Sequence, residues 1–275
     1  MSRVKDIIVK VIPAKIANEF VKKHHYSGKS VNSVLISFGC FLDNKLHGVM
    51  QFGNPIMKSN VIGLVKDTRW NEMLELNRMA FDDYLPKNSE SRCFSIAVKL
   101  LKKNAPHIKW VLSFSDGTQC GDGTIYRASG FLLTAIKKNE GIVKMPDGLI
   151  THKTAFMPGL KGATAVKRKY NWNEGKSVKK QLDDLGALEL EGFQLRYIYL
   201  IDKTCKITVP ILPFSAIDEA GAGMYKGEKI SLAERKNKCV DSLNSRTVDD
   251  QSKGGGAIPT STLHNNNINL IKKVS

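Results

Sequence analysis

Residues 74–101, LELNRMAFDDYLPKNSESRCFSIAVKLL, determine the fold that the sequence predicts. They begin as an apolar strand and continue through a polar loop without glycine into a helix, predicted over 89–103. The buried face of this helix comprises Phe94, Ala97, Val98 and Leu101, widened by Ile96 and Leu100. Asn88 or Ser89 is expected to cap its start. A strand that leads through a polar loop into a helix is the usual layout of a phosphate-binding site.

The start of this helix is a candidate anion site. The first turn of a helix presents unpaired N–H groups and the positive end of the helix dipole to an anion. The polar side chains around that turn are Lys87, Ser89, Ser91 and Arg92. A phosphate can bind there without glycines, and a helix that is simply well capped is the alternative.

The other elements predict a mixed sheet with helices on its faces. Each is recognised from its apolar periodicity and from the turn residues that flank it. In chain order they are a helix at 13–26, a hairpin at 34–53, a strand at 73–81, the helix at 89–103, a strand at 108–116, a short helix at 123–130, a strand from 131, a long insert and a strand at 192–202. This order indicates an α/β (α+β) fold.

The composition points to a polyanionic partner. Forty-two Lys and Arg against 26 Asp and Glu give a net charge of +16 and a pI of about 9.6. Nucleic acid is the first candidate and an acidic membrane the second, but no apolar run has the length of a spanning helix. The charged N-terminus is unlike a signal peptide, so a cytoplasmic protein is expected. The five cysteines lack CxxC pairing and are expected to be reduced thiols.

The insert contains a strongly basic segment, about 161–185. Basic residues interleaved with aromatic ones suit phosphate contact and base stacking. The candidate DNA-binding residues are Lys167, Arg168, Lys169, Tyr170 and Trp172. A solvated helix and loop is the alternative.

Three parts are expected along the chain. Residues 1–205 form the main domain, and 206–229 form an extension that packs on it. Residues 230–275 are polar and rich in Gly and Asn, so a disordered tail is expected there.

Several residues are candidates for chemistry, each with a structural alternative. His25 follows a lysine pair at a helix end, where it can instead complement the helix dipole. Asp116 ends an apolar strand and can instead form a turn. Arg78 lies in an apolar stretch and needs an anion or a buried partner such as Glu75 or Asp116. The Tyr126 hydroxyl is a candidate proton donor, and the structural alternative is that its ring packs in the core. Cys120 is a weaker candidate nucleophile.

The order of elements resembles the GNAT acyltransferase superfamily. In that superfamily the loop after the fourth strand and the next helix hold the pyrophosphate of coenzyme A. The resemblance therefore implies an acyl-CoA-like donor, bound by Arg78, Lys87, Ser89, Ser91 and Arg92. Residues 86–92, PKNSESR, depart from the superfamily's Gln/Arg-x-x-Gly-x-Gly/Ala loop, which puts ordinary acetyl-CoA use in doubt.

Six motifs in order resemble the Mom family of phage DNA-modification proteins, which are GNAT-like. They are HHYSG (24–28), FGNP (52–55), ELNRMAFDD (75–83), NSESR (88–92), SFSD (113–116) and GTIYRASGF (123–131). The resemblance is clearest over 20–135 and extends toward PILPFSAIDEAGAGMYKG (210–227). It implies an enzyme that converts adenine N6 in DNA to an acetamido (methylcarbamoyl) derivative and so shields phage DNA from restriction.

The same resemblance implies the site. By matching position, the residues thought to act there are His25, Tyr26, Arg78, Ser91, Asp116 and Tyr126. Iron is associated with the family, and His25, Asp116 and a tyrosinate offer suitable ligand atoms. The expected partner is double-stranded or transiently unpaired DNA, because an enzyme acting on N6 has to flip the base or find it unpaired. A homodimer is one possible oligomeric state.

Two other functions compete with this interpretation. A conventional acetyl-CoA-dependent GNAT N-acetyltransferase requires coenzyme A but does not require the +16 charge. A non-enzymatic DNA-binding protein explains the charge but not the polar motifs at predicted strand ends. A DNA amino-methyltransferase is disfavoured, because neither Asn/Asp-Pro-Pro-Tyr/Phe nor GxGxxG occurs.

Overall fold

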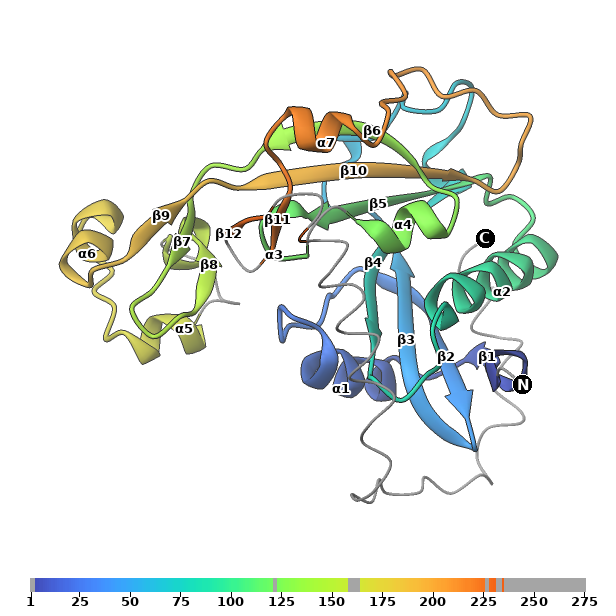
Figure 1. Cartoon of the computed structure of the whole chain (residues 1–275), viewed down its shortest axis with the longest axis horizontal. Helices are drawn as coiled ribbons and strands as arrows, with labels where there is room; N and C mark the ends of the chain where they lie inside the picture. The colour runs from blue at the N-terminus through green and yellow to red at the C-terminus, as the bar shows by residue number, and fades with distance from the viewer. Residues whose placement is uncertain (1–2, 121–122, 158–163, 226–227, 231–233, 235–275) are drawn as a thin grey trace.

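A seven-stranded sheet forms the centre of the molecule (Figure 1). The computed structural model describes residues 3–120, 123–157, 164–225, 228–230 and 234 of the chain. The strand order is β1-β2-β3-β4-β5-β10-β6, and only β4 and β5 run parallel to each other. The strands are β1 (Ile8–Val11), β2 (Val34–Leu42), β3 (Lys45–Gly53), β4 (Met73–Phe81), β5 (Trp110–Asp116), β6 (Leu132–Lys138) and β10 (Phe193–Leu200).

Two helices cover opposite faces of this sheet. In β3, Val49 packs in a cluster with α1 (Ala14–His24), whereas the next residue, Met50, packs in the cluster of α2 (Ser89–Asn104). Successive side chains of a strand point to opposite faces, so the two helices lie on different sides. The predicted mixed, mostly antiparallel sheet flanked by helices is confirmed.

The short connections have clear local causes. Asp43 and Asn44 close the hairpin between β2 and β3 with φ values of 51° and 60°, a conformation that Asp and Asn tolerate better than most residues. Helix α3 (Gly117–Cys120) and helix α4 (Thr124–Ala128) follow β5. The 3-10 turns are η1 (Arg3–Asp6), η2 (Lys58–Asn60), η3 (Trp70–Glu72) and η4 (Lys153–Phe156).

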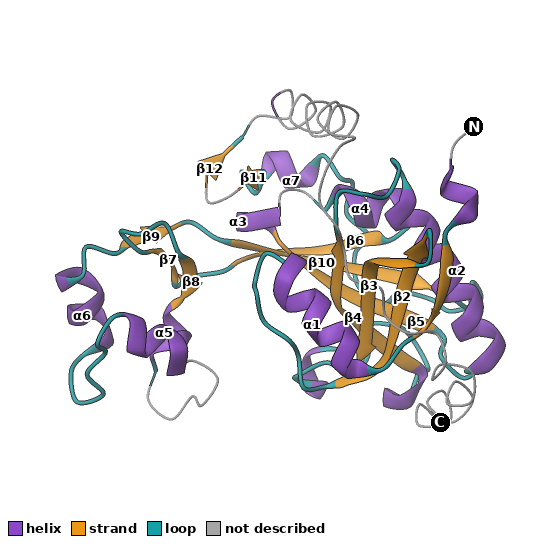
Figure 2. Cartoon of the chain, turned by 90° about the horizontal axis from the view of Figure 1, so that it is seen from below, coloured by secondary structure: helices purple, strands orange, loops and turns teal. Residues whose placement is uncertain are grey.

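A small unit, here called the arm (residues 139–192), projects from the ends of β6 and β10 (Figures 1 and 2). It contains a three-stranded antiparallel sheet in the order β8-β7-β9. Its elements are β7 (Ile142–Lys144), β8 (Ile150–His152), α5 (Thr164–Lys169), α6 (Val178–Asp184) and β9 (Leu188–Leu190). Val143, Met145, Phe156 and Leu182 form its own buried core. The basic segment therefore belongs to a packed unit.

After β10 the chain returns to the main domain. Helix α7 (Ala216–Glu219) is followed by β11 (Met224–Tyr225) and β12 (Glu228–Lys229). Ile217, Ala222 and Met224 are buried in the main core cluster. The tail predicted at 230–275 lies outside the described residues, apart from positions 230 and 234. None of the helices in the described part of the chain has the length and apolarity needed to cross a membrane.

The structure corrects one prediction about α2. Asn88 occupies the N-cap position with φ of 66°, but its side chain makes no capping hydrogen bond. The hydroxyl of Ser89 donates to the backbone carbonyl of Pro86, and the Ser91 hydroxyl donates to that of Asn88 over 3.2 Å. Two serines thus bond the loop carbonyls before the helix.

Candidate active site

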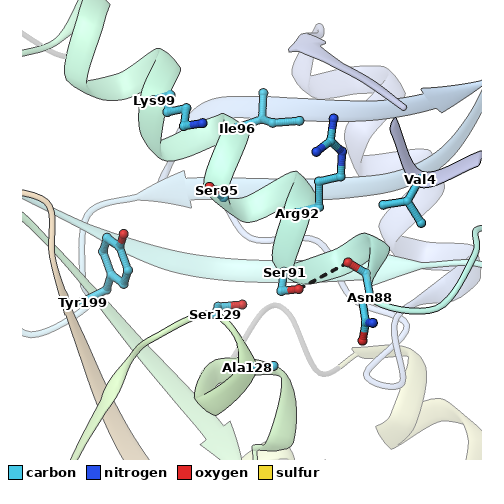
Figure 3. Close-up of a pocket in the computed structure, with 10 residues that line it drawn as sticks. All are labelled: Val4, Asn88, Ser91, Arg92, Ser95, Ile96, Lys99, Ala128, Ser129 and Tyr199. Carbon is cyan, nitrogen blue, oxygen red and sulfur yellow. Dashed lines mark hydrogen bonds between the residues drawn. The ribbon is translucent and has the colours of Figure 1, made fainter. Parts of the chain in front are cut away.

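A cavity of about 510 Å³ lies beside the first turns of α2 (Figure 3). One wall is the polar stripe of α2, the facing wall is the end of α4, and Tyr199 of β10 closes one side. The residues that line the cavity are Val4, Asn88, Ser91, Arg92, Ser95, Ile96, Lys99, Ala128, Ser129 and Tyr199. The lining is rich in hydroxyl and cationic groups, which are the groups that bind phosphate.

Two buried polar atoms at this cavity have no hydrogen-bond partner within the described protein: Nε of Arg92 and Oγ of Ser129. Another guanidinium nitrogen of Arg92 donates to the carbonyl of Lys5 over 3.5 Å, which is long for a hydrogen bond. A buried donor without a partner is costly, so such atoms are normally satisfied by water or a ligand. An anionic group with several oxygens fits this cavity.

The structure separates the predicted donor-binding residues. Ser91 and Arg92 line the cavity, but Lys87 is exposed outside its lining and Ser89 is fully buried. Arg78 belongs to a different cluster, described next. Ser95, Lys99 and Ser129 were not predicted. Arg92, Ser95 and Lys99 are spaced so that they lie on one face of the helix. This spacing could have indicated Ser95 and Lys99.

The second cluster begins at the end of α1, where the chain turns at His25 (φ −86°). The Nδ1 atom of His25 accepts a hydrogen bond from the backbone N–H of Ser27 over 3.2 Å and lies 2.8 Å from the Ser27 hydroxyl. Because Nδ1 is an acceptor, the proton of the neutral ring is assigned to Nε2. Burial, followed by the charge of Arg78, lowers the pKa of His25 to about 4. His25 is therefore a neutral hydrogen-bond donor at pH 7.

Arg78 occupies the middle of this cluster. Its Nε donates to the carbonyl of Lys29 over 3.2 Å, and another guanidinium nitrogen donates to the carbonyl of Asn77 over 2.7 Å. Burial lowers the pKa of Arg78, while the nearby groups Tyr26, Glu75 and Tyr126 favour its charged form. The guanidinium thus connects the loop after α1 to β4. It also lies near Tyr26, Glu75 and Tyr126.

Glu75 is the carboxylate that faces this cluster. It lies on β4, opposite Gly53 of β3 and Leu112 of β5, where the parallel pairing of β4 and β5 ends. Burial raises the pKa of Glu75, and a hydrogen bond with the Asn77 side chain and the charge of Arg78 oppose this effect. A half-buried carboxyl with a raised pKa is a typical proton acceptor in enzymes. The sequence indicated Glu75 only as a partner for Arg78.

Tyr126 connects the two clusters through α4. Its ring stacks on Tyr197 of β10, with centroids 4.9 Å apart, while Ala128 and Ser129 at the end of the same helix line the cavity. Gly123 precedes α4 with φ of 66°, and a Cβ there would lie 2.5 Å from the Tyr197 hydroxyl. Glycine at this position therefore allows α4 to pack closely on β10.

The other two predicted catalytic residues have different surroundings. Tyr26 is 53% exposed, and its ring lies 4.3 Å from that of His25. Asp116, at the end of β5, accepts a hydrogen bond of 3.0 Å from the backbone N–H of Thr118, as a turn-forming aspartate does. The side chain of Cys120 lies outside the described part of the structure.

The donor set does not fit the expected iron ion. Among the described residues no three His, Cys, Asp or Glu side chains gather closely enough to hold a metal. At His25, Nδ1 accepts the Ser27 N–H and Nε2 carries the proton, so neither nitrogen has a free lone pair. The iron site predicted at His25 and Asp116 is therefore not supported.

Most of the predicted DNA-binding residues make contacts within the arm. Lys167 is buried and bonds the Met157 carbonyl and Glu174, while Lys169 pairs with Asp147. The Tyr170 hydroxyl also donates to Asp147, and the Trp172 ring lies 4.4 Å from that of Phe156. Arg168 is exposed. These contacts give four of the five residues a structural role, and their contact with DNA stays a prediction.

The positive charge lies mainly outside the arm. Residues 139–192 contain nine Lys and Arg against seven Asp and Glu, whereas residues 1–138 contain 21 against 11. The basic segment at 161–185 therefore does not account for the +16 charge, which resides mostly on the main domain.

Comparison with known proteins gives one family and one curated relative. The sequence model of the Mom protein family matches residues 6–216. The protein named methylcarbamoylase mom of Escherichia phage Mu is 36% identical over 128 residues, which are 46% of this chain and 53% of that protein. The match thus spans about half the length of the relative.

Several solved acetyltransferase structures share low similarity with this one. The ribosomal-protein-S18-alanine N-acetyltransferase of Escherichia coli has a TM-score of 0.36 at 9% identity and covers 71% of this chain and 94% of its own. The IAA acetyltransferase of Bacillus cereus has 0.37 at 10% identity, with 69% and 97% covered. Both TM-scores are below 0.5, so these likenesses say nothing about what the chain acts on.

Proposed function

Because the chain belongs to the Mom protein family, we propose that it is a DNA-modifying transferase that converts adenine N6 to an acetamido (methylcarbamoyl) derivative and thereby protects DNA from restriction. The observation that carries the proposal is the arrangement of two clusters around α4. The cluster of His25, Glu75, Arg78 and Tyr126 suits an amine acceptor, and the cavity beside α2 suits an anionic donor.

The cavity is the proposed site of an acyl-CoA-like donor. Arg92, Lys99 and the hydroxyls of Ser91, Ser95 and Ser129 can bind its phosphate oxygens, because charge-assisted bonds to phosphate are strong. The unpartnered Nε of Arg92 and Oγ of Ser129 would then be satisfied. When bound, the donor supplies the two-carbon unit. Since Tyr126 lies on α4 and Ser129 caps its end, a donor bound at Ser129 is proposed to extend toward the second cluster.

Glu75 is the proposed acceptor of the N6 proton. The exocyclic amine of adenine is a weak nucleophile, so a base has to take the N6 proton while N6 bonds to the carbonyl carbon of the donor. The bond from that carbon to the thiol sulfur of the donor breaks in the same transfer, and the thiol is the leaving group. Burial raises the pKa of Glu75, which makes its carboxylate a better base than an exposed glutamate. The protonated Nε2 of His25 and the guanidinium of Arg78 can stabilise negative charge that develops on the reacting carbonyl oxygen.

Recognition of DNA is the remaining part of the proposal. A base inside a duplex is stacked, so the target adenine has to leave the helix to reach Glu75. The exposed ring of Tyr26, next to His25, can stack on such a base. Exposed cations on the main domain and four of the exposed cations of the arm, Arg168, Lys176, Lys179 and Lys180, are proposed to contact phosphates.

A conventional N-acetyltransferase acting on a protein or small amine is the second candidate. The donor cavity favours it as much as it favours the Mom-type reaction, because the cavity says nothing about the acceptor. The charge of 21 Lys and Arg against 11 Asp and Glu on residues 1–138 favours DNA as the acceptor.

Protection of plasmid DNA tests the proposed function. Plasmid is prepared from bacteria that express the protein or its Glu75→Gln variant, and is treated with restriction enzymes whose sites contain adenine. We expect resistance with the wild type, loss of resistance with Glu75→Gln, and retained resistance with the control Glu19→Gln, which alters an exposed residue of α1. Enzymes whose sites lack adenine should cut every plasmid. Complete cleavage of wild-type plasmid by all enzymes contradicts the proposal.

A further inference from the structure

The connection between β3 and β4 exposes large aliphatic side chains. This β3–β4 loop (residues 54–72) leaves Ile56 90% exposed, Met57 57% and Ile62 54%. Single exposed aliphatic residues are common, but three within seven positions form a patch that water solvates poorly. Such a patch indicates a surface that is covered when a partner binds.

The loop that presents these side chains is firmly attached to the domain. Val61, Leu64 and Val65 are buried in a cluster with Trp110 of β5 and Leu112 of β5. The backbone N–H of Lys66 donates to Lys206 and that of Thr208 donates to Leu64, over 2.8 and 3.0 Å. Because Val61, Leu64 and Val65 are anchored in the domain, the exposed side chains of the same loop stay on the surface and do not fold back into the core.

Cations accompany the apolar patch. Lys58 lies between the exposed Met57 and Ile62, with its ammonium 5.7 Å from the centroid of Trp70. Further exposed cations are Lys66 and Arg69 in the same loop and Lys206 in the segment bonded to it. A patch of aliphatic groups beside several cations is complementary to DNA, which offers phosphates outside and apolar base faces inside.

The start of the β3–β4 loop adjoins the proposed acceptor cluster. Gly53, the last residue of β3, lies opposite Glu75 in the register of β3 and β4. Ile56 is three residues further on, so its Cα can be at most about 11 Å from that of Gly53. The N–H of Asn54 donates over 3.2 Å to Ser33, in the same segment whose Lys29 carbonyl binds Arg78.

We propose that Ile56 and Met57, supported by Ile62, enter the base stack of duplex DNA and fill the space left by the adenine that turns toward Glu75. This inference rests on the proposed function. Proteins that unstack DNA often insert apolar wedges between base steps, and a filled gap keeps the extruded base from returning. The lysines beside the wedge hold the flanking phosphates.

The wedge has a specific test, because unpaired DNA needs no wedge. The Ile56→Ser/Met57→Ser double variant is compared with wild type on duplex and on single-stranded DNA, with nucleosides quantified by mass spectrometry. For the double variant we expect the rate of adenine modification on duplex DNA to fall by about tenfold and the rate on single-stranded DNA to stay unchanged. A tenfold fall corresponds to part of the free-energy cost of unstacking one base step. The control Ile8→Ser removes a 59% exposed aliphatic residue from β1 and should match the wild type.

A second readout separates this inference from the proposed chemistry. Duplex in which 2-aminopurine replaces part of the adenine becomes more fluorescent when the analogue unstacks. We expect the wild type, but not the double variant, to raise the fluorescence, even if no base is modified. An unchanged duplex rate, an equal loss on both substrates, or fluorescence that the double variant raises as much as the wild type overturns the wedge. Conversion of a wild-type dimer to monomer by the double variant also overturns it, because a second copy then covers the patch.

Discussion

The Nε of Arg78 donates a hydrogen bond of 3.2 Å to the backbone carbonyl of Lys29, residues that are 49 positions apart in the chain. This bond attaches the loop after α1 to β4 and brings His25 and Tyr26 to the same place as Glu75. Burial of Arg78 is costly, but the carbonyls of Lys29 and Asn77 and the nearby Glu75 compensate part of the cost. Arg78 therefore positions the loop after α1 and provides a positive charge in the candidate site.

Replacing Arg78 should change the titration of His25. In Arg78→Gln the nearby positive charge is lost but burial remains, and burial is the larger of the two causes that lower the pKa of His25. We expect this pKa to rise from about 4 while staying below 6.5. NMR titration of the His25 ring protons measures it. An unchanged His25 pKa would show that Arg78 does not act on this ring.

Glu75→Gln should lower activity and raise stability at neutral pH. Loss of a general base costs about 10²- to 10⁴-fold in rate. Burial raises the pKa of Glu75 in the folded state, so folding stability is highest below its unfolded pKa and falls as pH rises through its folded pKa. A glutamine side chain does not ionise, so the variant does not lose stability as the pH rises. We therefore expect it to melt at a higher temperature than the wild type at pH 7 and at a similar temperature near pH 4. Calorimetry at both pH values measures the difference; a variant less stable at pH 7 would contradict the assigned burial effect.

Two adjacent residues of the arm should behave differently. Lys167→Met leaves the Met157 carbonyl and Glu174 without their cation, and we expect a loss of about 1–3 kcal/mol in the free energy of unfolding. Arg168→Gln changes an exposed side chain and should leave stability within about 0.5 kcal/mol. If Arg168 contacts a phosphate, its loss lowers the slope of log affinity for DNA against log salt by about one. Denaturant unfolding and salt-dependent DNA binding separate the two roles.

Arg92→Gln should weaken binding of the donor. It removes the guanidinium whose buried Nε lacks a protein partner at the cavity, and a charge-assisted hydrogen bond contributes about 1.5–3 kcal/mol. We expect KM for the acyl donor to rise by roughly 10- to 100-fold. Lys103→Gln, on an exposed position of the same helix outside the cavity, is the matched control and should leave KM unchanged. Equal effects of both changes would mean that overall charge, and not the cavity, binds the donor.

The sequence predicts the main sheet well because its elements are long and periodic. The strand predicted at 73–81 has those bounds in the structure, and the predicted helix at 89–103 differs by one residue at its end. Strand β1 and the strands of the arm were missed, since three or four residues carry little periodicity. In addition, β1 and β9 pair with strands that are distant in sequence. Tertiary contacts decide such short elements.

The candidate site was predicted in part for a similar reason. His25, Arg78 and Tyr126 lie in recognisable motifs, and the structure brings them together. Lys87 and Ser89, by contrast, are not among the residues that line the cavity. Glu75 was considered only as an ion-pair partner, because its burial and raised pKa depend on the strands around it. Trp172 was predicted to contact DNA from the basic and aromatic composition alone, and that contact stays a prediction. The structure adds that its ring packs beside Phe156 in a core that the sequence did not indicate.

The most direct test of the proposed chemistry is the nucleoside composition of DNA from bacteria that express the protein. DNA is digested to nucleosides and analysed by mass spectrometry for deoxyadenosine that carries an acetamido group, with Glu75→Gln and Glu19→Gln in parallel. We predict a new adenine nucleoside in wild type and Glu19→Gln that is absent or strongly reduced in Glu75→Gln. Unmodified adenine in cells with abundant wild-type protein, or a modification that Glu75→Gln leaves undiminished, would contradict the account.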